Sequence, residues 1–399
     1  MWFGDKALGL RATVADVVHY CQLDWMKALQ HRWMGTIPTI GKNHGRCCSM
    51  RHFIGCDAHK KYSLFVAVDE AGQTKPAVRV NHDRESYRTF LRGLPASSSI
   101  AVETVGNWYW IVDEMQQAGH QPRLAHARKA KLMMGQLDKT DKLDARGLAT
   151  LLRNGTLPEV WIPSRETRDQ RELLRLRMTL VGMETRLKNR VHAILAKYAL
   201  RLEVTDVFSQ KGRRLVLEHL ENLPEETRQV VRQHLELLES TERQKRTTEQ
   251  RLQIIVQQSD DVDLLRTLPG VGWILATVIA LEIGDIQRFN QAPELASYAG
   301  TVPRVHSSGG KTRYGPVHPD VNRYLKWALI EAGNLIVMQQ QRLGDIHVVR
   351  LYRRLRPRKG HAKAVTAVAR HLAEAAFWVL KRQEPYKEPQ GCRVSSTHR

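Results

Sequence analysis

Short apolar segments and amphipathic stretches alternate between residues 53 and 125. Tyr62–Val68 alternates as a half-buried strand does, with Tyr62, Leu64, Val66 and Val68 on one face. The apolar segment Phe53–Asp57 precedes it and predicts another strand. Asp69–Gly72 has the composition of a turn, and Thr74–Val80 is expected to return as a third strand.

Helices and strands are then expected to alternate. The predicted elements are a helix at Arg84–Leu94, a strand at Ile100–Glu103, a helix at Trp108–Ala118, a strand at Arg123–Ala125 and a helical stretch at Ala127–Arg153. Three strands in a meander followed by alternating helices and strands is the order of an RNase H-like fold with a mixed sheet. We assign this α/β domain to residues 50–160.

A different period governs residues 161–260. Apolar residues recur at three- and four-residue spacing, namely Leu173, Leu176, Leu180, Met183, Leu187, Val191 and Ile194. This heptad seam predicts a long helix that pairs with another, and a weaker seam follows between Val231 and Ile255. An antiparallel helical hairpin and an intermolecular coiled coil both satisfy the pattern, and a packed helical bundle is the alternative.

The two ends and the last block complete the organisation. Residues 261–385 are expected to form a mostly helical domain, and residues 386–399 a disordered tail. Residues 1–49 lack periodicity, and we expect them to be a non-native or poorly structured extension before a start at Met50. A genuine helical prefix around Thr13–Arg32 is the alternative. The whole chain is therefore predicted to be α/β followed by α.

Charge narrows the class of partner. The chain has 62 Lys and Arg against 41 Asp and Glu, a net charge of +21, which favours nucleic acid over a merely basic soluble protein. The five cysteines form no Cys-x-x-Cys pair, which indicates a reducing compartment and argues against a thiolate zinc site. The most apolar stretch, Val271–Ile283, is too short to span a bilayer, so we expect a cytoplasmic protein.

Four carboxylates have positions suited to metal chemistry. Asp57 and Glu103 end two strands that lie side by side in an RNase H-like sheet, and Asp141 and Asp144 share one face of a predicted helix. Four such acids repel one another unless a cation lies among them, and Mg²⁺ or Mn²⁺ prefers oxygen ligands. Singly, each carboxylate is more often a surface residue or a helix cap, and Thr140–Asp141 is also a plausible helix start.

These motifs resemble a known family. Ile54–Lys60, Val102–Gly106 and Asp138–Ala145 are similar to the three acidic motifs of the DEDD-type insertion-sequence transposases, the IS110 family with its IS1111 branch. The resemblance implies a RuvC-like first domain in which Asp57, Glu103, Asp141 and Asp144 are the catalytic, metal-binding acids. His59 and Lys60 would be supports or phosphate contacts rather than metal ligands.

A second block carries the same resemblance. Leu295–Arg304, Ser307–Gly315 and Asn322–Leu325 resemble the carboxy-terminal transposase domain, in which a serine before glycine is the nucleophile. Ser308 matches that position, with Ser307 as the fallback; without the resemblance, these residues would indicate a flexible loop. The chain departs from the family at Val317–Asn322, where a Ser-Lys-x-Gly-Asn stretch is usual.

The resemblance implies an enzyme that cleaves and rejoins donor and target DNA, guided by a non-coding RNA and acting as a homo-oligomer, either a dimer or a tetramer. Cationic residues beside the motifs are the expected nucleic-acid contacts: Lys60, Lys142, Arg304, Lys311, Arg313 and Arg323. Two alternatives remain: a RuvC-like structure-specific endonuclease that uses water as its nucleophile, and a non-catalytic nucleic-acid-binding relic.

Overall fold

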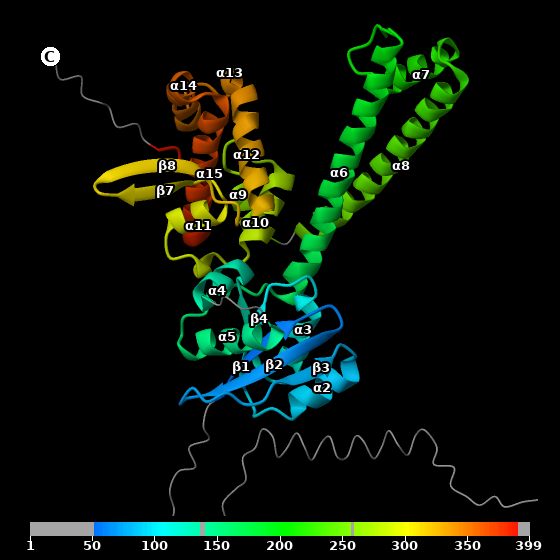
Figure 1. The fold of residues 1–399 in the computed structure, drawn as a ribbon. Coiled ribbons are helices and arrows are strands. Elements are labelled where there is room, and N and C mark those ends of the chain that lie inside the picture. Colours follow the sequence, from blue (N-terminus) through cyan, green and yellow to red (C-terminus); the bar gives the residue numbers. More distant parts are fainter. Residues whose placement is uncertain (1–51, 136–139, 257–258, 390–399) are drawn as a thin grey trace, which may run out of the picture. The chain divides into compact units, whose positions relative to one another are not determined.

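The computed structural model describes residues 52–135, 140–256 and 259–389, and the chain divides into two compact units. The first lies within Met1–Ile162 and the second within Pro163–Arg399, and each is described by itself (Figure 1). The predictions for residues 1–49, for Asp138 and Lys139, and for residues 390–399 lie outside the described part of the chain. No helix among the described residues is long and apolar enough to cross a membrane.

The first unit is a mixed six-stranded sheet with helices. Its elements are β1 (His52–Ala58), β2 (Tyr62–Asp69), β3 (Val78–Asn81), α2 (Arg84–Arg92), β4 (Ser99–Glu103), α3 (Trp108–Gln117), β5 (Gln121–Ala125), α4 (Ala127–Met134), α5 (Asp141–Arg153) and β6 (Glu159–Val160). The strand order is β3-β2-β1-β4-β5-β6, with β1, β4 and β5 parallel and the other pairings antiparallel. This order confirms the predicted RNase H-like sheet.

Helices cover both faces of this sheet. Tyr87 and Phe90 of α2 and Met115 of α3 join one buried apolar cluster with strand residues. The other face packs against α4 and α5 through a smaller cluster of alanines and leucines. Helix α5 lies directly on β1, because a Cβ added at Gly55 would be 1.9 Å from the carbonyl oxygen of Ala145. This close packing fixes the position of the start of α5 relative to the end of β1.

Two predicted elements of this unit are corrected. The predicted helical stretch Ala127–Arg153 is divided, because Gly135 ends α4 in the left-handed region at φ +59° and Thr140 caps a new helix. The predicted strand Thr74–Val80 pairs continuously only from Val78, since Pro76 has no N–H to donate to the ladder. The short edge strand β6 had no counterpart in the prediction.

The second unit begins with two long helices. Its elements up to residue 256 are α6 (Arg165–Lys197), α7 (Gln210–Glu218), the 3₁₀ turn η1 (Leu220–Asn222) and α8 (Glu225–Val256). Helices α6 and α8 pack against each other along their length as the predicted hairpin (Figure 1). The core between them includes Val191 and Ile194 of α6 with Val231 and Leu238 of α8.

The burial of the predicted heptad seam of α6 was only partly predicted correctly. Leu180, Val191 and Ile194 are buried as expected, but Leu176 and Met183 are 46% and 42% exposed. Charged residues take inward positions instead. Arg177 pairs with Glu249 at 2.9 Å and Lys245 with the buried Glu184 at 2.8 Å. A pattern of apolar residues alone does not reveal such pairs.

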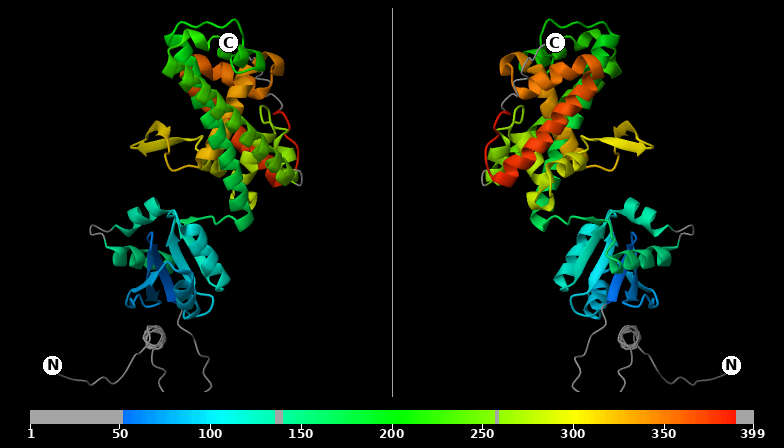
Figure 2. Two further views of the ribbon diagram at one scale, coloured as in Figure 1. Left: turned by 90° about the vertical axis from the view of Figure 1, so that its right-hand side faces the viewer. Right: turned by 90° about the vertical axis from the view of Figure 1, so that its left-hand side faces the viewer.

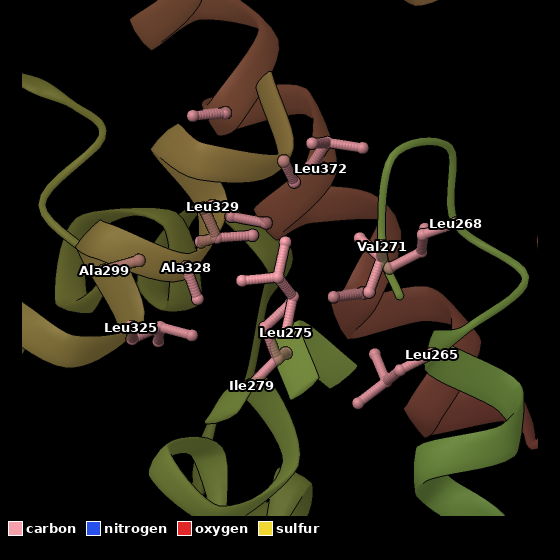
Figure 3. Close-up of a cluster of buried hydrophobic side chains, with 14 of the residues drawn as sticks. Leu265, Leu268, Val271, Leu275, Ile279, Ala299, Leu325, Ala328, Leu329 and Leu372 are labelled. Atoms are coloured by element: carbon pink, nitrogen blue, oxygen red, sulfur yellow. The ribbon is translucent and has the colours of Figure 1, made fainter. Parts of the chain in front are cut away.

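The rest of the second unit is mostly helical, as predicted. Its elements are α9 (Asp260–Leu265), α10 (Trp273–Ile283), the 3₁₀ turn η2 (Ile286–Arg288), α11 (Ala292–Tyr298), β7 (Pro303–Ser308), β8 (Lys311–Val317), α12 (Arg323–Met338), α13 (Gln340–Leu343), α14 (His347–Lys359) and α15 (His361–Arg382). Figure 3 shows the core, in which Leu275 and Ile279 of α10 meet Leu325 and Leu329 of α12. The described chain ends at Pro389, and Tyr386 donates its backbone N–H to Thr267 Oγ1 at 2.8 Å.

Strands β7 and β8 form an antiparallel hairpin in place of the flexible loop that the residue pattern alone indicated. They project from the helices of this unit in both figures that show the whole chain (Figures 1 and 2). Gly309 and Gly310 are the two turn residues, at φ +56° and +74°. Two successive residues at positive φ are typical of a type I′ hairpin turn, a conformation that glycine adopts without strain.

Candidate active site

Adjacent parallel strands bring two of the predicted acids to one edge of the sheet. Cys56 of β1 pairs with Val102 of β4, so Asp57 and Glu103 occupy the next position on each strand. Paired residues of neighbouring strands face the same side of a sheet. Both carboxylates are almost buried, at 8% and 6% exposure.

The other two acids begin helix α5. Thr140 Oγ1 accepts a hydrogen bond from the N–H of Leu143, so α5 starts at Asp141 and carries Asp144 in its first turn. Carboxylates at a helix N-terminus are stabilised by the helix dipole. The packing of α5 on Gly55 brings this turn towards the end of β1.

His59 lies between acids of the two elements. Its Nε2 is 3.1 Å from Asp57 Oδ2 and 3.1 Å from Asp141 Oδ2. Tyr62 donates its hydroxyl to the same Asp141 oxygen at 2.9 Å, and Asn107 donates to the carbonyl of His59 at 2.8 Å. Ligand atoms of Asp57, His59 and Asp141 all lie within 4.8 Å of one another, so these three side chains form a candidate metal site.

Burial and crowding make the ionised form of Asp57 costly. Its pKa is raised above the ordinary aspartate value, chiefly because burial disfavours the charge and further because Asp144 and Asp141 repel it. His59 opposes the shift. A partly buried set of carboxylates and one imidazole nitrogen fits a divalent cation, which would relieve this repulsion. When bound, such an ion stabilises charge on the oxygens of a phosphodiester during transfer.

The site differs from the predicted one in detail. The predicted acids Asp57 and Asp141 belong to the tight group, whereas Glu103 and Asp144 lie outside it in the residues that the structure describes. His59, expected to be a support, supplies a possible ligand atom, and Tyr62 was missed. Lys60 and Lys142, the predicted phosphate contacts of this unit, are both exposed.

Ser308 lies in the second unit, at the tip of the β7–β8 hairpin. Ser308 pairs with Lys311, and His306 pairs with Arg313, so all four share one face of the hairpin. All four are exposed. Arg304 belongs to this face too, because a Cβ added at Gly315 would lie 3.6 Å from both the Cβ of Arg304 and Nε2 of His306.

The fallback residue Ser307 faces the opposite side. It pairs with Thr312, and the two hydroxyl oxygens are 3.5 Å apart. Alternate residues of a strand point to opposite faces, so Ser307 is turned away from Lys311 and Arg313. The two neighbouring serines thus have different electrostatic surroundings.

Asn322 ends the segment Val317–Asn322, in which the sequence departs from the resemblance. Asn322 Oδ1 accepts from the N–H groups of Tyr324 and Leu325 and caps α12. Its Nδ2 donates to the buried Glu282 at 2.8 Å and to the hydroxyl of Tyr298 at 2.9 Å. Arg323, predicted to contact nucleic acid, is exposed at the first position of α12.

A mixed six-stranded sheet with acids at its central strand ends and on the following helix defines an RNase H-like DEDD domain. A model of the DEDD transposases of IS110 type matches residues 54–200. A second model, of the IS116/IS110/IS902 transposase family, matches residues 262–347. The chain belongs to the IS110/IS1111 family of DEDD transposases, which are DNA phosphoryl-transfer enzymes that mediate transposition.

Curated relatives extend over most of the chain. The transposase for insertion sequence element IS1111A of Coxiella burnetii is 25% identical over 351 residues, covering 88% of this chain and 95% of the relative. A probable family 20 transposase of Pseudomonas aeruginosa is 26% identical over 312 residues, covering 76% of this chain and 90% of the relative. A putative transposase of Sinorhizobium fredii, y4pF/y4sB, is 26% identical over 345 residues, covering 85% of this chain and 86% of the relative.

Proposed function

We propose that this transposase cleaves and rejoins donor and target DNA with Ser308 as its nucleophile. The observation that carries the proposal is the shared hairpin face of Ser308, Lys311 and Arg313. Cations beside a serine favour its alkoxide and attract the phosphate that it attacks. Ser307, paired with Thr312 on the other face, lacks that arrangement.

Each step of this exchange balances without a further reactant. The Ser308 hydroxyl loses its proton, an Oγ–P bond forms, and the P–O bond to one strand breaks as the departing oxygen takes up a proton. Attack by the corresponding hydroxyl of a second strand then restores Ser308 and joins the new strand. The phosphoserine conserves the bond energy between the two steps.

We further propose that Asp57, Glu103, Asp141 and Asp144 hold Mg²⁺ or Mn²⁺ in the first unit. The raised pKa of Asp57 and the short distances around His59 support a cation there. Lys60 and Lys142, exposed beside these acids, would contact the phosphates of bound DNA.

A guide RNA and a homo-oligomer complete the proposal. The net charge of +21 supports binding of more than one polyanion, which suits a non-coding RNA that pairs with donor and target. Leu176 and Met183, exposed one heptad apart on α6, supply an apolar stripe for a second copy. If purified protein without RNA discriminated between target sequences, the proposal of a guide RNA would be contradicted.

Trapping of a covalent protein–DNA adduct tests the nucleophile. Purified protein is incubated with labelled donor and target DNA and RNA from the flank of the element, then denatured and digested for peptide mass spectrometry. We expect a nucleotide on Ser308, an adduct with Ser307→Ala and none with Ser308→Ala. Cleavage that persists in Ser308→Ala without an adduct would favour the endonuclease that uses water.

A further inference from the structure

The second unit contains a groove that the transfer reaction does not use. It has a volume of about 690 Å³ and lies between the β7–β8 hairpin and the helices α14 and α15. The hairpin supplies Tyr314 and Val317, and the helices supply Leu355, Lys359, Lys363 and Arg370. One wall is therefore aromatic and apolar, and the other is cationic.

This groove lies on the side of the hairpin opposite to Ser308. Tyr314 pairs with Val305, whereas Ser308 pairs with Lys311, three positions from Tyr314 along β8. Side chains an odd number of positions apart on a regular strand face opposite ways. Val317 nevertheless shares the face of Tyr314, because the register shifts between Val305, the partner of Tyr314, and Pro303, the partner of Val317. Tyr314 is 73% exposed, although it is a large side chain with an apolar ring.

Two lysines give the groove an uncompensated positive charge. Lys359 ends α14 and Lys363 lies in the first turn of α15, and both are exposed. Neither forms a salt bridge with any residue that the structure describes, and no described residue lining the groove is acidic. Arg370 differs from them, since it pairs with Glu374 at 2.9 Å.

The two lysines flank the junction between α14 and α15. Lys359 is the last residue of α14, Gly360 follows it, and Lys363 is the third residue of α15. The carbonyl end of α14 and the N–H end of α15 meet at this junction, so their partial charges offset each other. The positive charge of this part of the groove therefore comes from the lysine side chains.

We infer that this groove binds a single strand of nucleic acid, with phosphates against Lys359 and Lys363 and an unpaired base stacked on Tyr314. Lysines bind phosphates as point charges, whereas an exposed aromatic ring stacks on the face of any unpaired base. A small anion would use the lysines but not the apolar wall of Tyr314, Val317 and Leu355. The proposal concerns a surface separate from Ser308 and stands whether or not Ser308 is the nucleophile.

Binding by the full chain in EDTA, where no cleavage occurs, tests this inference. Fluorescence anisotropy is measured over a salt series with a single-stranded DNA, an RNA of the same sequence and a blunt DNA duplex. The variants are the double change Lys359→Glu with Lys363→Glu, and the single changes Tyr314→Ala and Tyr314→Phe. The double change Lys197→Glu with Lys211→Glu is the matched control, because both lysines are exposed in the same unit.

The change of Lys359 and Lys363 to glutamate should weaken binding to every probe and lower the salt slope by about one unit per lysine. Tyr314→Ala should weaken single-strand binding by roughly fivefold to a hundredfold, without changing duplex binding, and Tyr314→Phe should keep the wild-type affinity. A Tyr314 effect confined to the RNA probe would identify RNA as the ligand, and one confined to the DNA probe would identify an opened DNA strand.

Two results would each overturn the inference. The first is that the variant with Lys359 and Lys363 changed binds like the Lys197 and Lys211 control. The second is that Tyr314→Ala binds every single strand like wild type. Displacement of the oligonucleotide by polyglutamate of equal charge, with no effect of Tyr314, would assign the groove to an acidic protein segment instead.

Discussion

Asp57 carries its charge in a place where charge is costly. Its carboxylate is 8% exposed and is crowded by Asp141 and Asp144, and its pKa is raised accordingly. A raised pKa means that the folded state holds the proton more tightly than the unfolded state. This contribution to stability is present at low pH and is lost as the pH rises through the raised pKa.

We therefore expect Asp57→Asn to stabilise the metal-free protein while removing its response to metal. Without metal, its unfolding midpoint should equal or exceed that of wild type. The difference should grow as the pH rises from the ordinary aspartate pKa to the raised pKa of Asp57, and should stay constant above it. Excess Mg²⁺ or Mn²⁺ should stabilise wild type by about 2.7 kcal/mol at a hundred times its Kd, and should not stabilise the variant. Differential scanning calorimetry with metal and with EDTA measures both.

The exposed Glu70 of the same unit provides the control. Glu70→Gln removes one carboxylate without touching the candidate site, so its metal response should match that of wild type. A full metal shift in Asp57→Asn would contradict the assignment of Asp57 as a ligand.

The sequence predicted the positions of Asp57 and Glu103 in the sheet better than those of the residues around them. Asp57 and Glu103 could be predicted because strands end at them and adjacent parallel strands bring such ends together. The position of His59 depends on a tight turn, in which its N–H donates to the carbonyl of Tyr62 at 2.8 Å. That turn directs His59 and Tyr62 back towards Asp141. The spacing of apolar residues does not predict such a turn.

Among the elements, α6 shows how the apolar seam divides between two faces. Leu180, Val191 and Ile194 pack inward, while Leu176 and Met183 remain exposed on the same helix. Residues seven apart share a helical face, so these two form one stripe. The periodicity predicted the long helix correctly and could not distinguish the stripe from the seam.

The stripe gives a prediction about assembly. Leu176→Glu with Met183→Glu should weaken self-association by at least about tenfold, because burying each apolar side chain contributes about 1.5–3 kcal/mol. Light scattering over a concentration series should report a lower mass with unchanged helical circular dichroism. Leu217→Glu, which changes an exposed leucine of α7, is the control and should leave the mass unchanged.

The residue pattern also missed the β7–β8 hairpin. Gly309 and Gly310 are a recognisable hairpin turn, but the flanking residues are mostly exposed on both faces and lack the apolar alternation of a packed strand. The resemblance identified Ser308 but not the side chains that share its face of the hairpin. Those follow from the strand register, which pairs Ser308 with Lys311 and Ser307 with Thr312.

For the whole molecule, the net charge predicted nucleic acid as the class of partner, and the motifs predicted a DNA transposase. The net charge of +21 belongs to a chain whose candidate metal site is acidic, which is the combination that metal-dependent chemistry on nucleic acid requires. The acids and Ser308 lie in different units, Met1–Ile162 and Pro163–Arg399. The acidic motifs of the first unit do not predict the serine motif of the second, so the two motif blocks had to be recognised separately.

Recombination in cells tests the central claim, a serine-dependent and metal-dependent transfer of DNA strands, most directly. Donor and target plasmids are supplied with the transposase and the flanking non-coding DNA of its element, and junctions are counted for wild type, Asp57→Ala, Ser308→Ala and Ser307→Ala. We predict junctions with wild type and Ser307→Ala, and at least about a hundredfold fewer with Asp57→Ala and Ser308→Ala, as expected when a nucleophile or a ligand is removed. Junctions at the wild-type frequency in Ser308→Ala, with none in Asp57→Ala, would contradict the serine mechanism and leave water or another hydroxyl as the nucleophile.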